Sequence, residues 1–153
     1  MNNKKPIIAM ASDHTAYGLK AGIIEFLTAK GFECRDFGAG IDVKESDYPD
    51  FSIPAARAVA AGECCLGILV CGTGIGMSIA ANKIRGIRAA VCGDTFSARA
   101  AREHNDANVL CIGKRVTGSG LALDIVDIFV STEFSGEERH IRRLQKISDA
   151  EIK

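Results

Sequence analysis

The stretch "GILVCGTGIGMSIAANK", from Gly67 to Lys83, decides how this chain folds. A short apolar run ends at Cys71, a loop with glycine at every second position follows, and a segment with helical spacing begins. Strand, glycine loop and helix is a usual layout for holding an anion on backbone N–H groups. Neither common phosphate motif fits, because Met77 stands where a dinucleotide fingerprint needs glycine and the P-loop pattern has no match. The feature to explain is a thiol at the mouth of an anion-binding loop.

The rest of the chain alternates short β-branched runs with longer segments of helical spacing. Strands are expected within 7–13, 32–38, 67–72, 87–93 and 108–113, and helices within 15–31, 47–63, 76–86, 95–106, 120–134 and 137–153. This alternation predicts an α/β fold, a three-layer α/β/α Rossmann-like sandwich with a five-stranded parallel sheet. We expect the common strand order 2-1-3-4-5.

In that order the topological switch lies between the first and third strands, and ligands bind at the carboxyl ends there. Those ends carry Asp13 and His14 on the first strand, and Cys71 with its glycine loop on the third. Loop chemistry and topology therefore select the same crevice.

Composition narrows the class of partner. The 153 residues predict one domain over 1–153, and 19 Lys plus Arg balance 19 Asp plus Glu, so nothing favours nucleic acid or an anionic membrane. No apolar stretch reaches 18 residues and no signal peptide is recognised, which indicates a cytoplasmic protein with a small-molecule partner. The six cysteines have no zinc spacing, and Cys92 and Cys111 are expected as small buried hydrophobes.

Cys71 differs from the other cysteines because it ends its apolar run beside backbone N–H groups and a helix N-terminus, which favour a thiolate. A thiolate there could act as nucleophile or general base, although a buried cysteine that happens to end a strand is equally compatible with the spacing. Asp13, His14, His104 and Cys71 are also of the residue types that bind a metal ion. No i, i+4 ligand pair supports such a site, so we expect no metal.

The last helical segment carries a second candidate feature. Arg139 and Arg143 are four residues apart and share a helix face, with His140 and Arg142 beside them. Two guanidinium groups on one face suit a phosphate dianion, whereas a charged face of this kind is otherwise simply solvated.

Several motifs together resemble a known family. The motifs "SDH", "SDYPDF", "GILVCGTGIGMSIAANKIRGIRAAVC", "REHNDANVLCIGKRVTG" and "RHIRRLQKI" are similar to those of ribose-5-phosphate isomerase type B and the wider group of pentose and hexose phosphate isomerases. The resemblance runs from about residue 7 to residue 147. It implies a metal-free, cofactor-free enzyme that interconverts ribose 5-phosphate and ribulose 5-phosphate through a cis-enediolate.

The resemblance also implies roles for individual residues. Cys71 would be the base that moves the proton between C1 and C2, assisted by Thr73. His104, aided by Asp13, would open the furanose ring. The remaining substrate contacts would be an anion hole at Gly72, Thr73, Gly74, Ile75 and Gly76, a sugar contact at Asn105, and phosphate contacts at His14, Arg115, Arg139 and Arg143.

A shared site is implied as well. In the resemblance the protein is a homodimer, possibly a tetramer, and the C-terminal helix, about 136–150, packs on a partner subunit. Cys71 and the arginine helix would come from one subunit, while His104, Asn105 and Arg115 would come from the other.

Three rival interpretations remain open on the sequence. The same scaffold could isomerise a hexose 6-phosphate such as allose or galactose 6-phosphate. A nicotinamide oxidoreductase would use Asp94 on the ribose, but the third glycine is missing. A receiver-like phosphoacceptor module would need an aspartate where Cys71 stands.

Overall fold

The protein, in a computed structural model, is described over residues 6–151. Every predicted segment overlaps an observed element of the same type, and the predicted helix 15–31 also includes part of a 3-10 turn. Residues 1–5 of the predicted domain and 152–153 of the last predicted helix lie outside the described residues. The strands are β1 (Ile7–Ser12), β2 (Glu33–Asp36), β3 (Leu66–Cys71), β4 (Ala89–Val91) and β5 (Val109–Gly113). A 3-10 turn (His14–Ala16) precedes α1 (Tyr17–Ala29), and the other helices are α2 (Pro49–Ala60), α3 (Ile75–Ala81), α4 (Thr95–Glu103), α5 (Ser119–Ser131) and α6 (Glu138–Asp149).

The five strands form one parallel sheet in the order β2-β1-β3-β5-β4, so the predicted order 2-1-3-4-5 is wrong in its last two strands. The physical reason is burial. All five residues of β5 are buried and need cover on both faces and both edges, whereas β4 has three residues, none of them fully buried, and serves as an edge. The predicted switch between β1 and β3 is confirmed, because the chain leaves β2 at one edge and returns on the other side of β1.

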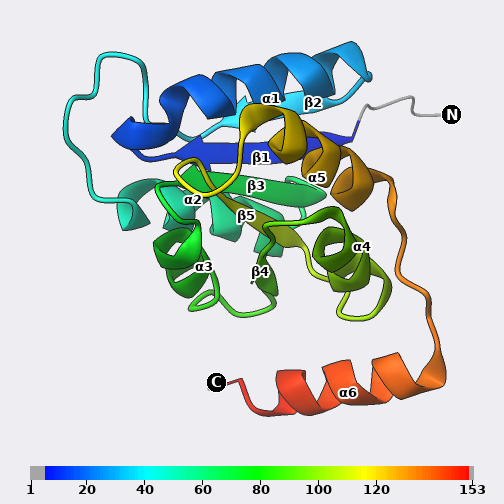
Figure 1. The fold of residues 1–153 in the computed structure, drawn as a ribbon. Coiled ribbons are helices and arrows are strands. Elements are labelled where there is room, and N and C mark those ends of the chain that lie inside the picture. The colour runs from blue at the N-terminus through cyan, green and yellow to red at the C-terminus, as the bar shows by residue number, and fades with distance from the viewer. Residues whose placement is uncertain (1–5, 152–153) are drawn as a thin grey trace, which may run out of the picture.

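Side chains alternate across the sheet and fill two cores. Ile8 and Met10 of β1 pack with residues of α1, α4 and α5, while Ala9 and Ala11 face α2 and α3. In β3, Val70 belongs to the first core and Cys71 to the second. The predicted three-layer sandwich is therefore confirmed, with α1, α4 and α5 on one face and α2 and α3 on the other (Figure 1).

The C-terminal helix α6 is not part of either layer. A segment from Thr132 to Glu137 leads away from α5, and α6 then runs beneath the sandwich (Figure 1). His140 is buried on this helix, whereas Ile141 and Ile147 are about half exposed. Within residues 6–151, no helix is both long enough and apolar enough to cross a membrane.

Candidate active site

Two strand ends at the topological switch bring Asp13 and Cys71 together. Ser12 of β1 is in register with Val70 of β3, and the Asp13 N–H donates to the Val70 carbonyl at 3.2 Å. Asp13 and Cys71 are thus neighbours at the carboxyl edge of the sheet. This is the crevice in which the sequence predicts a ligand.

Cys71 is 5% exposed, and its sulfur accepts a hydrogen bond from the Gly74 N–H at 3.1 Å. The loop turns back sharply to make this bond, because Gly74 has φ +80° and a Cβ there would lie 3.0 Å from the backbone of Ile112. From the other side, a Cβ on Gly113 would lie 2.6 Å from the backbone of Thr73. The backbones of these two loops are therefore in direct contact, with no side chain between them, and this contact holds the Cys71 thiol in place.

The predicted anion hole spans a loop and the start of a helix. Gly72 to Gly74 form the loop, Ile75 and Gly76 begin α3, and the Ile75 N–H donates to the Thr73 hydroxyl at 3.3 Å. Among the hydrogen bonds of the described chain, the N–H groups of Thr73, Gly76 and Met77 donate none. These donors are free to hold an oxyanion.

Tyr48 packs against Gly76 at the end of the predicted anion hole, and the sequence alone predicted no role for it. A Cβ on Gly76 would lie 2.7 Å from the Tyr48 ring, so glycine is what lets the ring rest on the first turn of α3. The ring is 40% exposed and faces the loop from α2's N-terminal side. The motif "SDYPDF" was the available signal.

Asp13 and His14 are held by short polar contacts. One oxygen of Asp13 accepts from the Thr15 N–H at 3.0 Å and from the Thr15 hydroxyl at 2.7 Å. The hydroxyl of Ser46 lies 3.0 Å from His14 Nδ1 and accepts from the His14 N–H at 3.1 Å. The loop that carries Ser46 and Tyr48 therefore closes over the carboxyl ends of β1 and β3.

Arg115 also belongs to this edge. Its N–H donates to the Gly72 carbonyl at 2.9 Å, and a Cβ on Gly72 would lie 3.4 Å from the guanidinium carbon. The predicted assignment of Arg115 to the opposite subunit from Cys71 is wrong, because β3 and β5 are neighbours and their following loops bond directly. We call this group the thiol cluster: Asp13, His14, Tyr48, Cys71, Gly72–Gly76 and Arg115.

His104 and Asn105 lie at the opposite edge of the sheet. They precede β5, whose first residue Val109 pairs with Ala89, whereas its last residue Gly113 pairs with Cys71. At about 3.3 Å per residue, the length of β5 alone separates the two edges by roughly 13 Å. One chain therefore does not bring His104 or Asn105 to its own Cys71.

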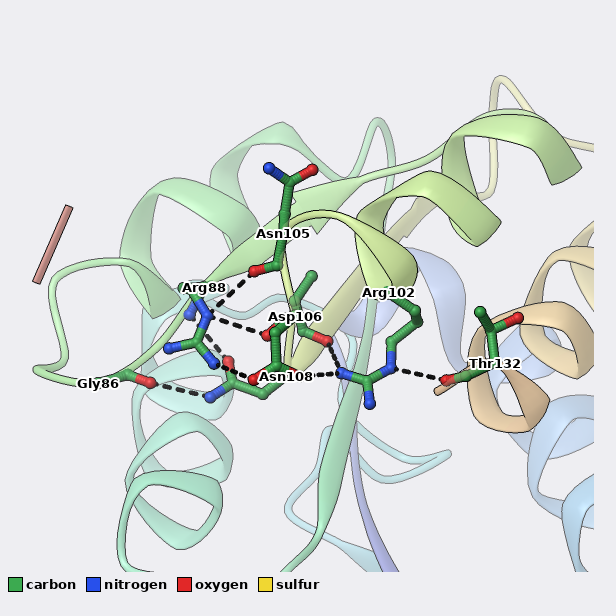
Figure 2. A network of polar contacts seen from close by, with 8 residues as sticks. Gly86, Arg88, Arg102, Asn105, Asp106, Asn108 and Thr132 are labelled. Carbon is green, nitrogen blue, oxygen red and sulfur yellow. Dashed lines mark hydrogen bonds and ion pairs between the residues drawn. The ribbon is translucent and has the colours of Figure 1, made fainter. Parts of the chain in front are cut away.

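A polar network clamps the turn that presents His104 and Asn105 (Figure 2). Arg88 donates to the carbonyls of Asn105 and Asp106, and both Arg88 and Arg102 pair with the Asp106 carboxylate at 3.0 Å. Asp106 has φ +42°, and the two arginines hold it there. The side chain of Asn105 points away from the network, so its amide is available to a ligand (Figure 2).

Helix α6 docks on the same edge through a histidine stack. The rings of His104 and His140 lie 4.6 Å apart and within 10° of parallel. His140 is 4% exposed and its buried Nε2 has no partner among the described residues. Burial lowers the pKa of His140, and the charges of His104 and Arg139 lower it further.

The two arginines of α6 therefore lie at the same edge of the sheet as His104. Arg139 is exposed and pairs with Glu137 at 2.8 Å, and Arg143 is exposed one turn later. The predicted grouping of the arginine helix with Cys71 in one subunit is wrong, because α6 rests on the amino edge of its own sheet. We call this second group the histidine cluster: His104, Asn105, Arg139, His140 and Arg143.

Two further cysteines, Cys92 and Cys111, lie in the protein core. Cys92 and Cys111 are almost fully buried, as predicted. Burial raises the pKa of both thiols, to about 11 for Cys92, and Asp94 adds to the effect there. Over residues 6–151 no cluster of three His, Cys, Asp or Glu side chains is placed to bind a metal ion.

Comparison with known proteins extends over nearly the whole chain. The family model described as Ribose/Galactose Isomerase matches residues 8–147. Ribose-5-phosphate isomerase B of Escherichia coli is 45% identical over 144 residues, which is 94% of this chain and 95% of the relative.

Solved structures agree with this match. The structure of ribose-5-phosphate isomerase B of Clostridium thermocellum is 52% identical with a TM-score of 0.90, covering 94% of this chain and 95% of that one. The structure of ribose-5-phosphate isomerase B of Mycoplasma genitalium, with bound ribulose-5-phosphate, is 41% identical with a TM-score of 0.89 and covers 94% of each chain.

Proposed function

Because the chain belongs to the Ribose/Galactose Isomerase family, we propose that it interconverts ribose 5-phosphate and ribulose 5-phosphate. Family membership confirms the resemblance that the motifs indicated, and the protein is a sugar-phosphate isomerase. The single observation that carries the proposal is the geometry of Cys71. A thiol that already accepts a backbone N–H stands beside unused N–H donors at the mouth of a crevice.

The thiol cluster suits proton transfer at a carbon next to a carbonyl. In the aldose-to-ketose direction, the Cys71 thiolate takes the proton from C2, and the carbonyl oxygen at C1 gains the charge. The proton of the C2 hydroxyl passes to this oxygen by way of the Thr73 hydroxyl, and the thiol returns its own proton to C1, which leaves the ketone at C2. Free N–H groups of the glycine loop stabilise the enediolate oxygens, with the Thr73 hydroxyl beside them.

The remaining chemistry needs the histidine cluster of a second chain. We propose a homodimer in which the His104 and Asn105 of one subunit, with Arg139 and Arg143, face the thiol cluster of the other. His104 would open the furanose ring together with Asp13, and the arginines would hold the phosphate with His14 and Arg115. Support comes from the sheet length, which keeps the two clusters of one chain apart.

An apolar surface supports a partner at the thiol edge. Exposed apolar side chains lie at or beyond the carboxyl ends of three neighbouring strands: Ile75 and Ile79 in α3, Val91 at the end of β4, Phe96 in α4 and Val116 after β5. Phe96 is 77% exposed and Val116 71% exposed. Apolar groups gathered at one edge favour contact with another protein surface, and a second copy is the simplest partner. Whether dimers pair further into tetramers stays open.

The substrate is tested by comparing kcat/KM for ribose 5-phosphate, allose 6-phosphate and galactose 6-phosphate. We expect ribose 5-phosphate to give the highest value. A higher value for either hexose phosphate would assign the protein to the hexose branch of the same family. We further expect the protein to act in the cytoplasm, because six free cysteines, Cys65 exposed among them, suit a reducing compartment.

A further inference from the structure

A cavity of about 420 Å³ lies between α1 and the loop that joins β5 to α5. Helices α1 and α5 are neighbours on the face of the sheet opposite α2 and α3 (Figure 1). The walls of the cavity are Gly18, Leu19 and Gly22 of α1 and Leu123 of α5, so Cys71 and the glycine loop do not line it. The volume falls within the range of small-molecule sites in proteins, about 300 to 1,000 Å³.

One end of the cavity is polar and has no acidic residue in its lining. Gly118 and Ser119 bring the N-terminus of α5 to it, and the first turn of that helix has N–H groups without intrahelical partners. Lys114 lines the same end and forms no ion pair within the described chain. Backbone donors and an ammonium group together favour an anion.

Thr117 is an independent indication of a ligand. It is 4% exposed, lines the cavity, and uses its N–H on the Gly113 carbonyl at 2.8 Å. Its hydroxyl takes part in none of the side-chain hydrogen bonds of residues 6–151, and it is not among the fully buried atoms that lack a partner, so the little surface it keeps faces the cavity. A ligand oxygen in the cavity would supply the acceptor that the protein does not.

The glycines of α1 indicate that the space is kept open. Gly18 and Gly22 lie inside a 13-residue helix, where glycine is unfavourable relative to alanine. No neighbour explains them, because a Cβ at either position would meet nothing within 4 Å. The space that side chains at these two positions would occupy is part of the cavity.

We propose that this cavity binds a small phosphate monoester, with its phosphate at the N-terminus of α5 and its apolar part between Leu19 and Leu123. The phosphate would accept hydrogen bonds from the Thr117 hydroxyl and the first N–H groups of α5, and would pair with Lys114. This site is separate from the thiol cluster and does not depend on isomerase activity.

The test is a titration of ¹⁵N-labelled protein with phenyl phosphate, followed by the amide signals of Ser119 and Gly120. These signals should shift and saturate, and inorganic phosphate should bind at least about tenfold more weakly because it buries no apolar surface. Thr117→Val keeps the side-chain shape and should weaken binding about tenfold or more. Because it removes an unpartnered hydroxyl, this variant should fold at least as well as the wild type.

A second pair of variants separates filling of the cavity from helix stabilisation. Gly22→Leu should fill the cavity and abolish the shifts, whereas the matched Gly22→Ala should raise the melting temperature and keep binding within a few fold. The proposal is overturned if phenyl phosphate moves only the amides of residues 72–76, or if Thr117→Val and Gly22→Leu bind like the wild type. The titration needs no turnover, so its outcome is independent of the substrate comparison.

Discussion

The thiol cluster and the histidine cluster are built by opposite means. Around Cys71 the contacts are backbone to backbone, and glycine at positions 74 and 113 lets two loops touch without side chains between them. Around His104 the contacts are made by side chains: Arg88 and Arg102 clamp Asp106, and the His140 ring of α6 stacks on the His104 ring. In the first cluster Asp13, Cys71 and Gly74 are buried, whereas in the second His140 alone is buried.

The difference matches two chemical demands. A base that removes a proton from carbon must be held within a few tenths of an ångström, and the backbone of a parallel sheet provides that rigidity. A phosphate carries its charge on several oxygens and tolerates longer, more mobile partners such as arginine. The predictions below test this division, from the largest expected effect to the smallest.

Removal of the thiol should have the largest effect. Cys71→Ala should lower kcat by at least about a hundredfold, since a general base contributes roughly 10² to 10⁴ in rate. The fold should persist, because alanine keeps a small apolar side chain in the core and the change removes only one weak acceptor, that of the Gly74 N–H. Steady-state kinetics and circular dichroism give the two readouts.

Cys65→Ala is the matched control, since Cys65 is an exposed thiol one strand length away. It should keep wild-type kinetics. In that background iodoacetamide should inactivate the enzyme and substrate should protect it. Retention of most activity by Cys71→Ala would remove the thiol from the mechanism.

Loss of one arginine of α6 should act mainly on binding. Arg143→Ala should raise KM about 10- to 150-fold with a much smaller change in kcat, because a phosphate distant from the reacting carbons is held similarly in ground and transition states. Arg142→Ala, one residue earlier and about 100° around the helix, serves as the control. An unchanged KM in Arg143→Ala would show that this face of α6 contacts solvent and not the phosphate.

The two clusters also differ in how far the sequence predicted them. Strand and helix positions follow from local periodicity, and the thiol cluster follows from one local motif at the strand ends. The order of β4 and β5 was missed because "IRAAVCG" and "NVLCIG" look alike, and only packing decides which strand is enclosed. Tyr48 was missed because its contact with Gly76 joins a loop without periodicity to a distant helix.

Assignment to subunits was the weakest part of the sequence interpretation. Arg115 was separated from Cys71, although the Lys114 and Arg115 N–H groups bond to the carbonyls of Cys71 and Gly72. Periodicity within a segment holds no information on which distant loops meet. The catalytic and binding roles of the individual residues stay predictions.

Subunit mixing tests whether the two clusters of different chains cooperate. Cys71→Ala and His104→Ala homodimers should both be nearly inactive. When they are unfolded and refolded together, about half the dimers are mixed and half the sites of these are intact, so about a quarter of wild-type activity should return. If confirmed subunit exchange restores nothing, each chain builds its own site.

The same experiment tests the corrected grouping of the arginine helix. Measured well below KM, Arg143→Ala mixed with Cys71→Ala should recover activity, because the two lesions lie in different clusters. Arg143→Ala mixed with His104→Ala should recover none, since every site then has one damaged histidine cluster. The opposite pattern would show that Cys71 and the arginine helix at one site come from the same subunit.

The smallest expected effect is a pH dependence of the docking of α6. Burial lowers the pKa of His140 in the folded state, and His104 and the neighbouring arginines lower it further, against a smaller opposing effect of Glu137. An unfolded histidine has a pKa of about 6.5, so between this value and the lower folded value the undocked form binds more protons. Stability of the docked helix should therefore be complete above about pH 6.5 and decline as the pH falls toward the folded pKa. The protection factors of the α6 amides, which are corrected for the intrinsic pH dependence of exchange, should fall as the pH is lowered over this range, while those of β1 and β5 stay constant and provide the internal reference. His140→Phe keeps a ring against His104 but cannot take up a proton, so the protection factors of its α6 should be the same at both ends of the range. If the protection of wild-type α6 does not respond to pH, or if His140→Phe responds equally, the buried ring of His140 does not control how the histidine cluster is held.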